Sequence, residues 1–161
     1  LMLWYMGRAR TVTAKTALVG HKGIEVEDLA CAVITFASGA MGIIEGSTAI
    51  WPGHPARVEV HGTTGSAVLE DGELVKWQFK DPQPADEGIL AGIERGATLG
   101  SGASDPIASL KHEGHRRQIA DFVSAIRDNR DPKIDGREGR KAVELIEAIY
   151  RSAETGTTVT L

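Results

Sequence analysis

Cysteine is almost absent from this sequence of 161 residues, where Cys31 is the only one. A lone cysteine has no partner within the chain, so a disulfide-stapled domain is excluded and a reducing, cytoplasmic setting is the default expectation. Long apolar runs are also missing, because the longest charge-free stretch, residues 29–44, has only 16 residues and includes Thr, Ser and Gly. A membrane-spanning helix needs roughly 18 apolar residues, so we expect no membrane partner.

Charge of one sign is not in excess either. The chain has 22 acidic and 18 basic residues, a net charge of −4, which argues against nucleic acid as a partner. What remains is an ordinary composition, 42% apolar and 25% charged, which excludes disordered and collagen-like chains. The length predicts one domain with a real core.

The first half of the chain has the period of β-strands. Val75, Trp77 and Phe79 alternate with polar residues, which predicts one buried and one wet strand face. Asp71-Gly72 lies between two apolar pairs and predicts a type I′ hairpin, and Ser38-Gly39 predicts a second turn. We count about six strands, and their short connections favour antiparallel neighbours.

The second half changes to the period of helices. A first helix, Glu113 to Asn129, carries an apolar stripe at i, i+3, i+4 and i+7, and a second helix, Gly136 to Thr155, is bounded by an Asp135 cap and a Gly156 stop. A last short strand follows. We expect both stripes to pack on the sheet; they are Ile119, Phe122, Val123 and Ile126 in the first helix, and Ala142, Val143, Ile146, Ile149, Tyr150 and Ala153 in the second.

Between the strands and these helices lie residues 81–112, half of which are Gly, Pro, Ser or Ala. Segments of this length without regular structure are uncommon in compact domains and usually have a function or are mobile. A short helix around Ile89, Leu90 and Ile93 is predicted to interrupt it.

The strand Asp28 to Ala37 is apolar on both faces. One face carries Leu29, Cys31 and Val33, and the other carries Ala30, Ala32, Ile34 and Phe36. Two helices cover only one face of a sheet, so the second face is expected to meet another domain or another copy of the chain, as a homodimer or a tetramer. We expect Cys31 itself to be an inert core residue.

No cofactor fingerprint is present. Gly100 and Gly102 begin a G-x-G, but Asp105 stands where a dinucleotide motif has its third glycine, and no strand leads into it. Walker loops and G-x-S-x-G elbows are absent as well. We therefore expect no cofactor to be bound by this chain alone.

Two local clusters are candidates for contact with a substrate. The first is the loop Trp51-Pro52-Gly53-His54-Pro55, where Trp51 and His54 follow a strand, although Pro and Gly also suit a plain tight connection. The second is His112-Glu113-Gly114-His115 at the start of a helix. Its histidines are three apart, whereas the HExxH zinc motif needs four, so the alternatives are two solvated side chains, a substrate contact, or a metal site.

Two long segments carry a family resemblance: HGTTGSAVLEDGELVKW at residues 61–77, and HRRQIADFVSAIRDNRDPKIDGREGRKAVELIEAIYRSAETG at residues 115–156. They resemble the C-terminal domain of the glucose-fructose oxidoreductase, inositol dehydrogenase and rhizopine-catabolism family. The resemblance implies an α+β domain, in which a large, mainly antiparallel sheet has helices on one face and an open face for assembly. It also implies a separate N-terminal Rossmann domain that binds NAD or NADP.

The family's catalytic groups are a lysine in an E-K-P stretch and an aspartate and a histidine on a helix. Residues 1–7, LMLWYMG, are similar to the tail of that helix, so the resemblance places these groups before Leu1 and assigns no catalytic or cofactor-binding residue here. It implies that residues 1–161 are the substrate-binding and oligomerisation domain of a cytoplasmic oxidoreductase acting on a sugar, cyclitol or related polyol. Trp51, His54, His112 and His115 are then the residues expected to shape the pocket, and the chain alone is expected to be inactive.

Two other functions stay open at this point. One is a stand-alone assembly or binding module, which predicts that no G-x-G-x-x-G or E-K-P is encoded upstream of Leu1. The other is a metal hydrolase built on His112 and His115, which predicts stoichiometric zinc.

Overall fold

The computed structural model describes residues 1–96 and 113–161. The chain divides into two compact units, one formed by Leu1–Ala49 with Lys111–Leu161 and the other by Ile50–Leu110. The α+β class with antiparallel strands is confirmed. The described strands are divided between a four-stranded and a three-stranded sheet, whereas the sequence predicted one large sheet. Residues 48–56 join the two sheets and include Pro52 and Pro55, which lack the N–H that a strand ladder needs.

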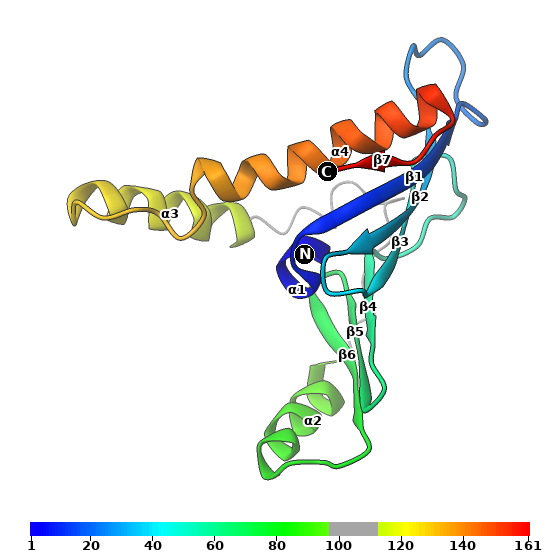
Figure 1. The fold of residues 1–161 in the computed structure, drawn as a ribbon. Helices are drawn as coiled ribbons and strands as arrows, with labels where there is room; N and C mark the ends of the chain where they lie inside the picture. Colours follow the sequence, from blue (N-terminus) through cyan, green and yellow to red (C-terminus); the bar gives the residue numbers. More distant parts are fainter. Residues whose placement is uncertain (97–112) are drawn as a thin grey trace. The chain divides into compact units, whose positions relative to one another are not determined.

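The first unit holds the four-stranded sheet, with strand order β3-β2-β1-β7 (Figure 1). Its hairpin between β2 and β3 turns at Gly39, whose φ of 87° favours glycine, as the Ser38-Gly39 signal predicted. The elements are α1 (Met2–Met6), β1 (Ala9–Ala17), β2 (Leu29–Phe36), β3 (Met41–Ser47), α3 (Glu113–Arg127), α4 (Gly136–Thr155) and β7 (Val159–Thr160).

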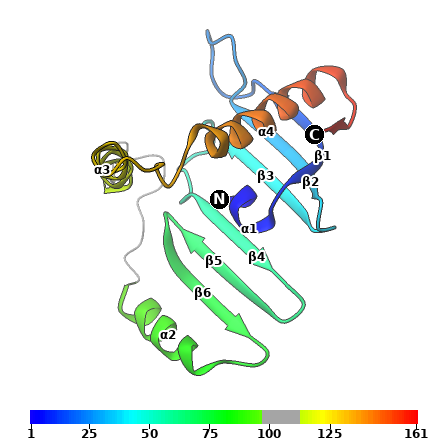
Figure 2. The ribbon, with the colours of Figure 1, turned by 60° about the vertical axis from the view of Figure 1, so that its left-hand side comes forward.

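The core of this unit lies between the sheet and α4. Helix α4 runs along β1 and β7 on one face of the sheet, as two views show (Figures 1 and 2). Val12, Ile34 and Phe36 of the sheet are at most 1% exposed. Full burial of such a side chain stabilises the fold by roughly 1.5–3 kcal/mol before the entropy cost. On the helix side the core holds Leu145, Ala148 and Ile149, with Met2, Leu3 and Met6 packed beside it.

The ends of α4 form as the sequence predicted, but its buried face is rotated. Asp135 accepts a hydrogen bond from the backbone N–H of Glu138 at 2.9 Å, and Gly156 ends the helix with a φ of 68°. Ser152 can be fully buried because its hydroxyl bonds two backbone groups. The helix side that carries Ser152 also carries Leu145, Ala148 and Ile149, and this side faces the sheet. Of the predicted stripe, Ile149 is buried and Ala153 half-buried, whereas Ala142, Val143, Ile146 and Tyr150 are exposed.

Helix α3 does not pack its stripe on the sheet, and that prediction is wrong for the described residues. Ala125 is its only described buried residue. The loop after α3 covers this side of the helix, because the N–H of Arg130 donates to the Ala125 carbonyl at 3.0 Å and Asp121 accepts from Arg130 and from the N–H of Lys133. These bonds fix the inward side of α3 about 100° away from the predicted stripe.

The second unit holds the three-stranded sheet, in the order β4 (Arg57–His61), β5 (Gly65–Glu70) and β6 (Glu73–Phe79), followed by α2 (Pro84–Gly96). The predicted hairpin forms at Asp71 and Gly72, whose φ values are 48° and 83°. A register shift pairs Leu74 with Leu69 and Lys76 with Val68. Val75 is left between them and is 37% exposed, and Phe79 is 39% exposed, so the predicted buried face is wrong at both residues and only Trp77 is half-buried.

Helix α2 confirms the short helix predicted around Ile89. It is tied to β6, since the Trp77 indole N–H donates to Asp86 Oδ1 at 2.8 Å. Gly100, Gly102 and Asp105 lie outside the described residues. Within residues 1–96 and 113–161, no helix has the length and apolarity needed to cross a bilayer.

Candidate functional site

The loop that carries Trp51 and His54 projects its side chains into solvent. A cis peptide precedes Pro52, and Gly53 has a φ of 90°, a conformation that favours glycine. The Trp51 side chain is 90% exposed, and His54 is exposed as well. The sequence prediction that these two residues contact a ligand stays a prediction.

Of the two histidines in the HEGH cluster, only His115 lies among the described residues. His115 lies exposed in the first turn of α3. His112 lies outside the described residues, so their pairing stays a prediction. In the described part of the chain, no three His, Cys, Asp or Glu side chains are grouped so as to hold a metal ion.

A buried carboxylate, which the sequence analysis did not single out, organises the loop between β1 and β2. Asp28 is 3% exposed and accepts hydrogen bonds of 2.8 Å from the backbone N–H groups of Val19, Gly20 and His21. The His21 ring lies 3.1 Å from the same carboxylate. The backbone N–H of His21, followed by that of Val19, holds the pKa of Asp28 well below its usual range. Because both of its oxygens accept hydrogen bonds from the loop and its side chain is buried, Asp28 positions the loop.

A second polar network lies on the three-stranded sheet. His61 joins Ser66 Oγ at its Nδ1 and Glu59 Oε2 at its Nε2, each at 3.0 Å. Arg57 bonds Glu59 at 2.6 Å and Glu70 at 2.7 Å. The hydrogen bond from His61, and then that from Arg57, lowers the pKa of Glu59. Arg57, Glu59 and His61 alternate along β4, and this alternation is the signal in the sequence from which the network was predictable.

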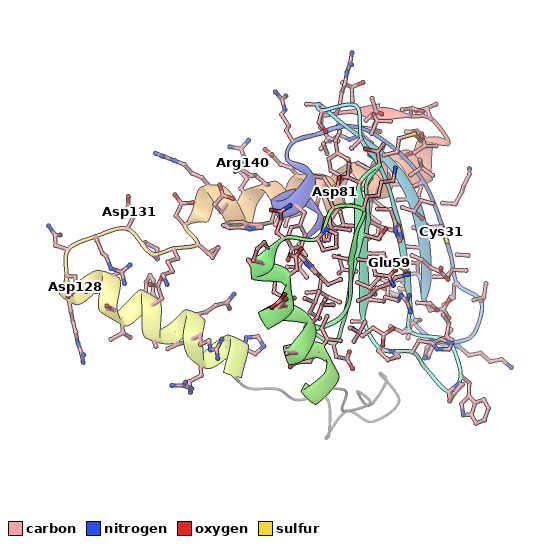
Figure 3. All side chains as sticks on the ribbon, turned by 90° about the horizontal axis from the view of Figure 1, so that it is seen from below. Cys31, Glu59, Asp81, Asp128, Asp131 and Arg140 are labelled. Atoms are coloured by element: carbon pink, nitrogen blue, oxygen red, sulfur yellow. The ribbon has the colours of Figure 1, made fainter. Side chains whose placement is uncertain are left out.

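This network contains the residue types of a proton relay, but its side chains are exposed to solvent and do not lie in a buried site. His61 is 60% exposed and Glu59 is 40% exposed at their side chains (Figure 3 labels Glu59). Exposed ion pairs between neighbouring strands contribute little, typically below about 1 kcal/mol, and they help to fix the register of the strands. Only the Arg57–Glu70 and His61–Ser66 bonds cross from β4 to β5, so the network supports the register of a pairing that the backbone makes.

The open face of the four-stranded sheet has no cover from the described residues. Its side chains form rows across the strands, with Val33 beside Ile43 in one row and Lys15, Cys31 and Glu45 in the next. Val33 is 44% exposed and Ile43 is 75% exposed. The predicted division of β2 into two faces is confirmed, because Ala32, Ile34 and Phe36 are buried on the opposite side.

Cys31 corrects one sequence prediction. It lies on this open face and is exposed, not buried in the core (Figure 3). The prediction failed because alternation alone cannot say which of two apolar strand faces is covered.

The starts of helices α2 and α4 do not fit the phosphates of a dinucleotide. Such a site needs free backbone N–H groups at a helix N-terminus. The first turn of α2 carries Asp86 and Glu87, and Asp86 already accepts from the N–H of Gln83 at 2.7 Å. The N-terminus of α4 is capped by Asp135. Carboxylates at these positions repel a pyrophosphate and occupy its donors.

A comparison with protein families gives the decisive observation. The family described as "Oxidoreductase family, C-terminal alpha/beta domain", GFO_IDH_MocA_C, matches residues 1–161. The chain belongs to this family. The resemblance read from residues 61–77 and 115–156 is thereby confirmed over the whole sequence.

Two kinds of relative agree with this assignment. The uncharacterized oxidoreductase YrbE of Bacillus subtilis is 28% identical over 149 residues, which are 90% of this chain and 39% of YrbE. The WlbA dehydrogenase of Bordetella pertussis, solved with NADH and UDP-GlcNAcA, is 26% identical with a TM-score of 0.79. The WlbA dehydrogenase of Chromobacterium violaceum, solved with the same two molecules, is 27% identical with a TM-score of 0.76.

The extent of these matches is as informative as their identity. The chain is covered completely in both WlbA comparisons, but it spans only 44% and 42% of those proteins. This Gfo/Idh/MocA-type domain therefore corresponds to less than half of the relatives that it matches.

Proposed function

We propose that this chain is the substrate-binding and assembly domain of a cytoplasmic NAD(P)-dependent oxidoreductase acting on a sugar, cyclitol or related polyol. The observation that carries the proposal is the complete match of this chain to 44% of a protein solved with NADH and a UDP-linked sugar acid. The helix starts of α2 and α4 also support the proposal. They are capped or acidic and do not suit the phosphates of a nucleotide, so the proposal assigns the nucleotide to another domain.

In this proposal the chemistry is divided between two domains. A nicotinamide cofactor exchanges a hydride with a carbinol carbon of the substrate. The cofactor site and the groups that move the proton belong to the part of the parent protein that this chain does not cover, as the resemblance of residues 1–7 to a helix tail implies. The residues of this chain bind the substrate and orient it.

Trp51, His54, His112 and His115 are the residues proposed to contact the substrate. The exposed indole of Trp51 offers a flat apolar surface for the C–H face of a sugar or cyclitol ring. An imidazole both donates and accepts hydrogen bonds, so His54 and the histidines of the HEGH cluster suit hydroxyl groups.

The open face of the four-stranded sheet is proposed to bind a second copy of the chain. A two-fold axis places each surface against itself, so an isologous interface needs patches that complement themselves. This face meets that need, because Val33 and Ile43 supply an apolar centre and the next row carries Lys15 and Glu45, whose charges are opposite. A stable dimer or tetramer of this kind buries at least about 1,000 Å².

Substrate binding is tested with the product of the complete reading frame and a panel of sugars, cyclitols and nucleotide sugars. We expect NAD(P)-dependent turnover of at least one of them, and Trp51→Ala to raise its KM about tenfold or more with kcat changed less. Val26→Ala removes another exposed apolar side chain, 63% exposed in a different loop, and is expected to leave KM unchanged. Equal KM values for Trp51→Ala and the unmodified enzyme would contradict the proposal that Trp51 contacts the substrate.

Assembly is tested by sedimentation of the unmodified protein and of Val33→Asp. The unmodified protein is expected to sediment as a dimer or tetramer, and Val33→Asp as a folded monomer with unchanged circular dichroism. An unmodified protein that is monomeric at tens of micromolar contradicts the proposed role of the open face.

A further inference from the structure

We infer that the apolar stripe of α3 is the surface on which the nucleotide-binding domain of the parent protein docks. The stripe consists of Ile119, Phe122, Val123 and Ile126. The inference rests on the proposed function, because that function requires a separate nucleotide-binding domain.

The stripe is large and exposed. Ile119 is 64% exposed, Phe122 56%, Val123 40% and Ile126 66%. The spacing i, i+3, i+4 and i+7 places all four on one side of a 15-residue helix. Soluble proteins rarely leave such a continuous apolar strip in water unless another surface covers it.

The helix is anchored on its other side, so the stripe is held in place for a partner. Asp121 accepts from Arg130 Nη2 at 2.9 Å and from the N–H of Lys133 at 2.7 Å. These two groups, with the backbone N–H of Lys133 as the larger cause, lower the pKa of Asp121. The loop so anchored leaves a hollow of about 410 Å³ beside Phe122, which Pro132 and Ile134 line together with the polar residues Arg117, Gln118, Asp121 and Lys133.

A second copy of this chain does not suit the stripe. Arg127 follows Val123 by four residues, so its cation neighbours the stripe on the helix surface. An isologous contact that pairs this end of the stripe with itself would bring two like charges together. The open sheet face, with Lys15 and Glu45 in one row, carries the opposite charges that such a contact needs.

A separate domain of the same protein does suit it. The relatives solved with NADH continue for more than half of their length beyond the part that this chain matches. A domain that delivers a cofactor to a substrate must be held against the substrate-binding domain, and contacts between domains of one chain typically bury about 600–1,500 Å². The stripe forms an apolar surface for such a contact, with a partly polar hollow beside it, and it is separate from the open sheet face.

Site-specific photo-crosslinking in the product of the complete reading frame tests the inference. Benzoylphenylalanine replaces Ile119 in one sample and, as the matched control, Ala120 in another; Ala120 is exposed and lies about 100° around the helix. We expect the probe at Ile119 to crosslink within one chain to the segment encoded before Leu1. The probe at Ala120 is expected to give at most a tenth of that yield.

A pair of variants tests the same contact without a probe. Ile119→Glu is expected to speed proteolytic cleavage between the two domains roughly ten- to hundredfold, as the loss of one fully buried isoleucine implies. Ala120→Glu introduces the same charge and is expected to leave the cleavage rate within twofold. The oligomer seen by sedimentation is expected to be the same in both variants.

Three results would overturn the inference. They are a crosslink from the Ile119 probe to a second chain, a crosslink to residues 50–96 of its own chain, and a reading frame that encodes no further domain. Failure of the proposed function gives a different result. In that case the unmodified protein binds no NADH and turns over none of the sugars, cyclitols and nucleotide sugars tested, whatever the crosslink shows.

Discussion

Ser152 is the residue whose removal tests the architecture of the core most sharply. Its hydroxyl is fully buried, accepts the backbone N–H of Ala14 at 2.9 Å and donates to the carbonyl of Thr157 at 2.7 Å. Strand β7 pairs with β1 only at Thr11 and Val12, so Ser152 takes the place of a strand partner for Ala14. Ser152→Ala leaves that buried N–H without a partner.

An orphaned buried donor costs roughly 1–3 kcal/mol, so we expect the free energy of unfolding to fall by about 2 kcal/mol. With an m-value of about 2 kcal/mol/M in urea, the unfolding midpoint falls by about 1 M. Thr155→Ala is the matched control, since it removes an exposed hydroxyl of the same helix that bonds the Arg151 carbonyl at 2.8 Å. We expect this control to shift the midpoint by less than about 0.3 M, because its partners remain solvated. Equal midpoints for the two variants would refute the bridging role of Ser152.

Three further predictions follow from other parts of the first unit. Gly156→Ala is expected to lower the free energy of unfolding by about 1 kcal/mol in urea titration, because a φ of 68° disfavours a side chain. Ile34→Asp is expected to prevent folding, whereas Val33→Asp on the exposed face stays folded, and circular dichroism distinguishes them. The depressed pKa of Asp28 stabilises the fold above its unfolded pKa, near 3.9, and this contribution is lost as the pH falls below it. Asp28→Asn is therefore less stable than the unmodified chain at pH 7, and thermal denaturation should show the difference shrinking from about pH 5 downward. A constant difference would contradict the ionised role of Asp28.

The sequence predicts local structure well where one interaction decides it. Asp71-Gly72 specifies its hairpin through backbone conformation, and Asp135 and Gly156 fix the ends of α4. The period of two along β2 separates its faces correctly. These signals depend on residues that are neighbours in the chain, so no knowledge of the tertiary structure is needed.

The errors share a different cause. The sequence placed the stripe of α3 on the sheet and Cys31 in the core, and the structure exposes both. An apolar face predicts that something covers it, but it does not say which element, copy or domain does so. The rotation of α4 has the same origin, since Ser152 reads as a polar surface residue until its two backbone partners are known.

The candidate site was predictable only in part. Trp51 and His54 stand out in the sequence because Pro and Gly surround them, and the structure places both in solvent. The bonds of Asp28 to the loop between β1 and β2 depend on backbone N–H groups, which carry no signature in the sequence.

The central claim is that this chain is the half of an oxidoreductase that does not hold the cofactor. Titration into NADH, followed by nicotinamide fluorescence, tests it directly when the chain and the product of the complete reading frame are measured side by side. The account predicts saturable NADH binding by the complete protein and none by this chain at physiological concentrations. Saturable binding of NADH by this chain alone, at micromolar concentration, would contradict it.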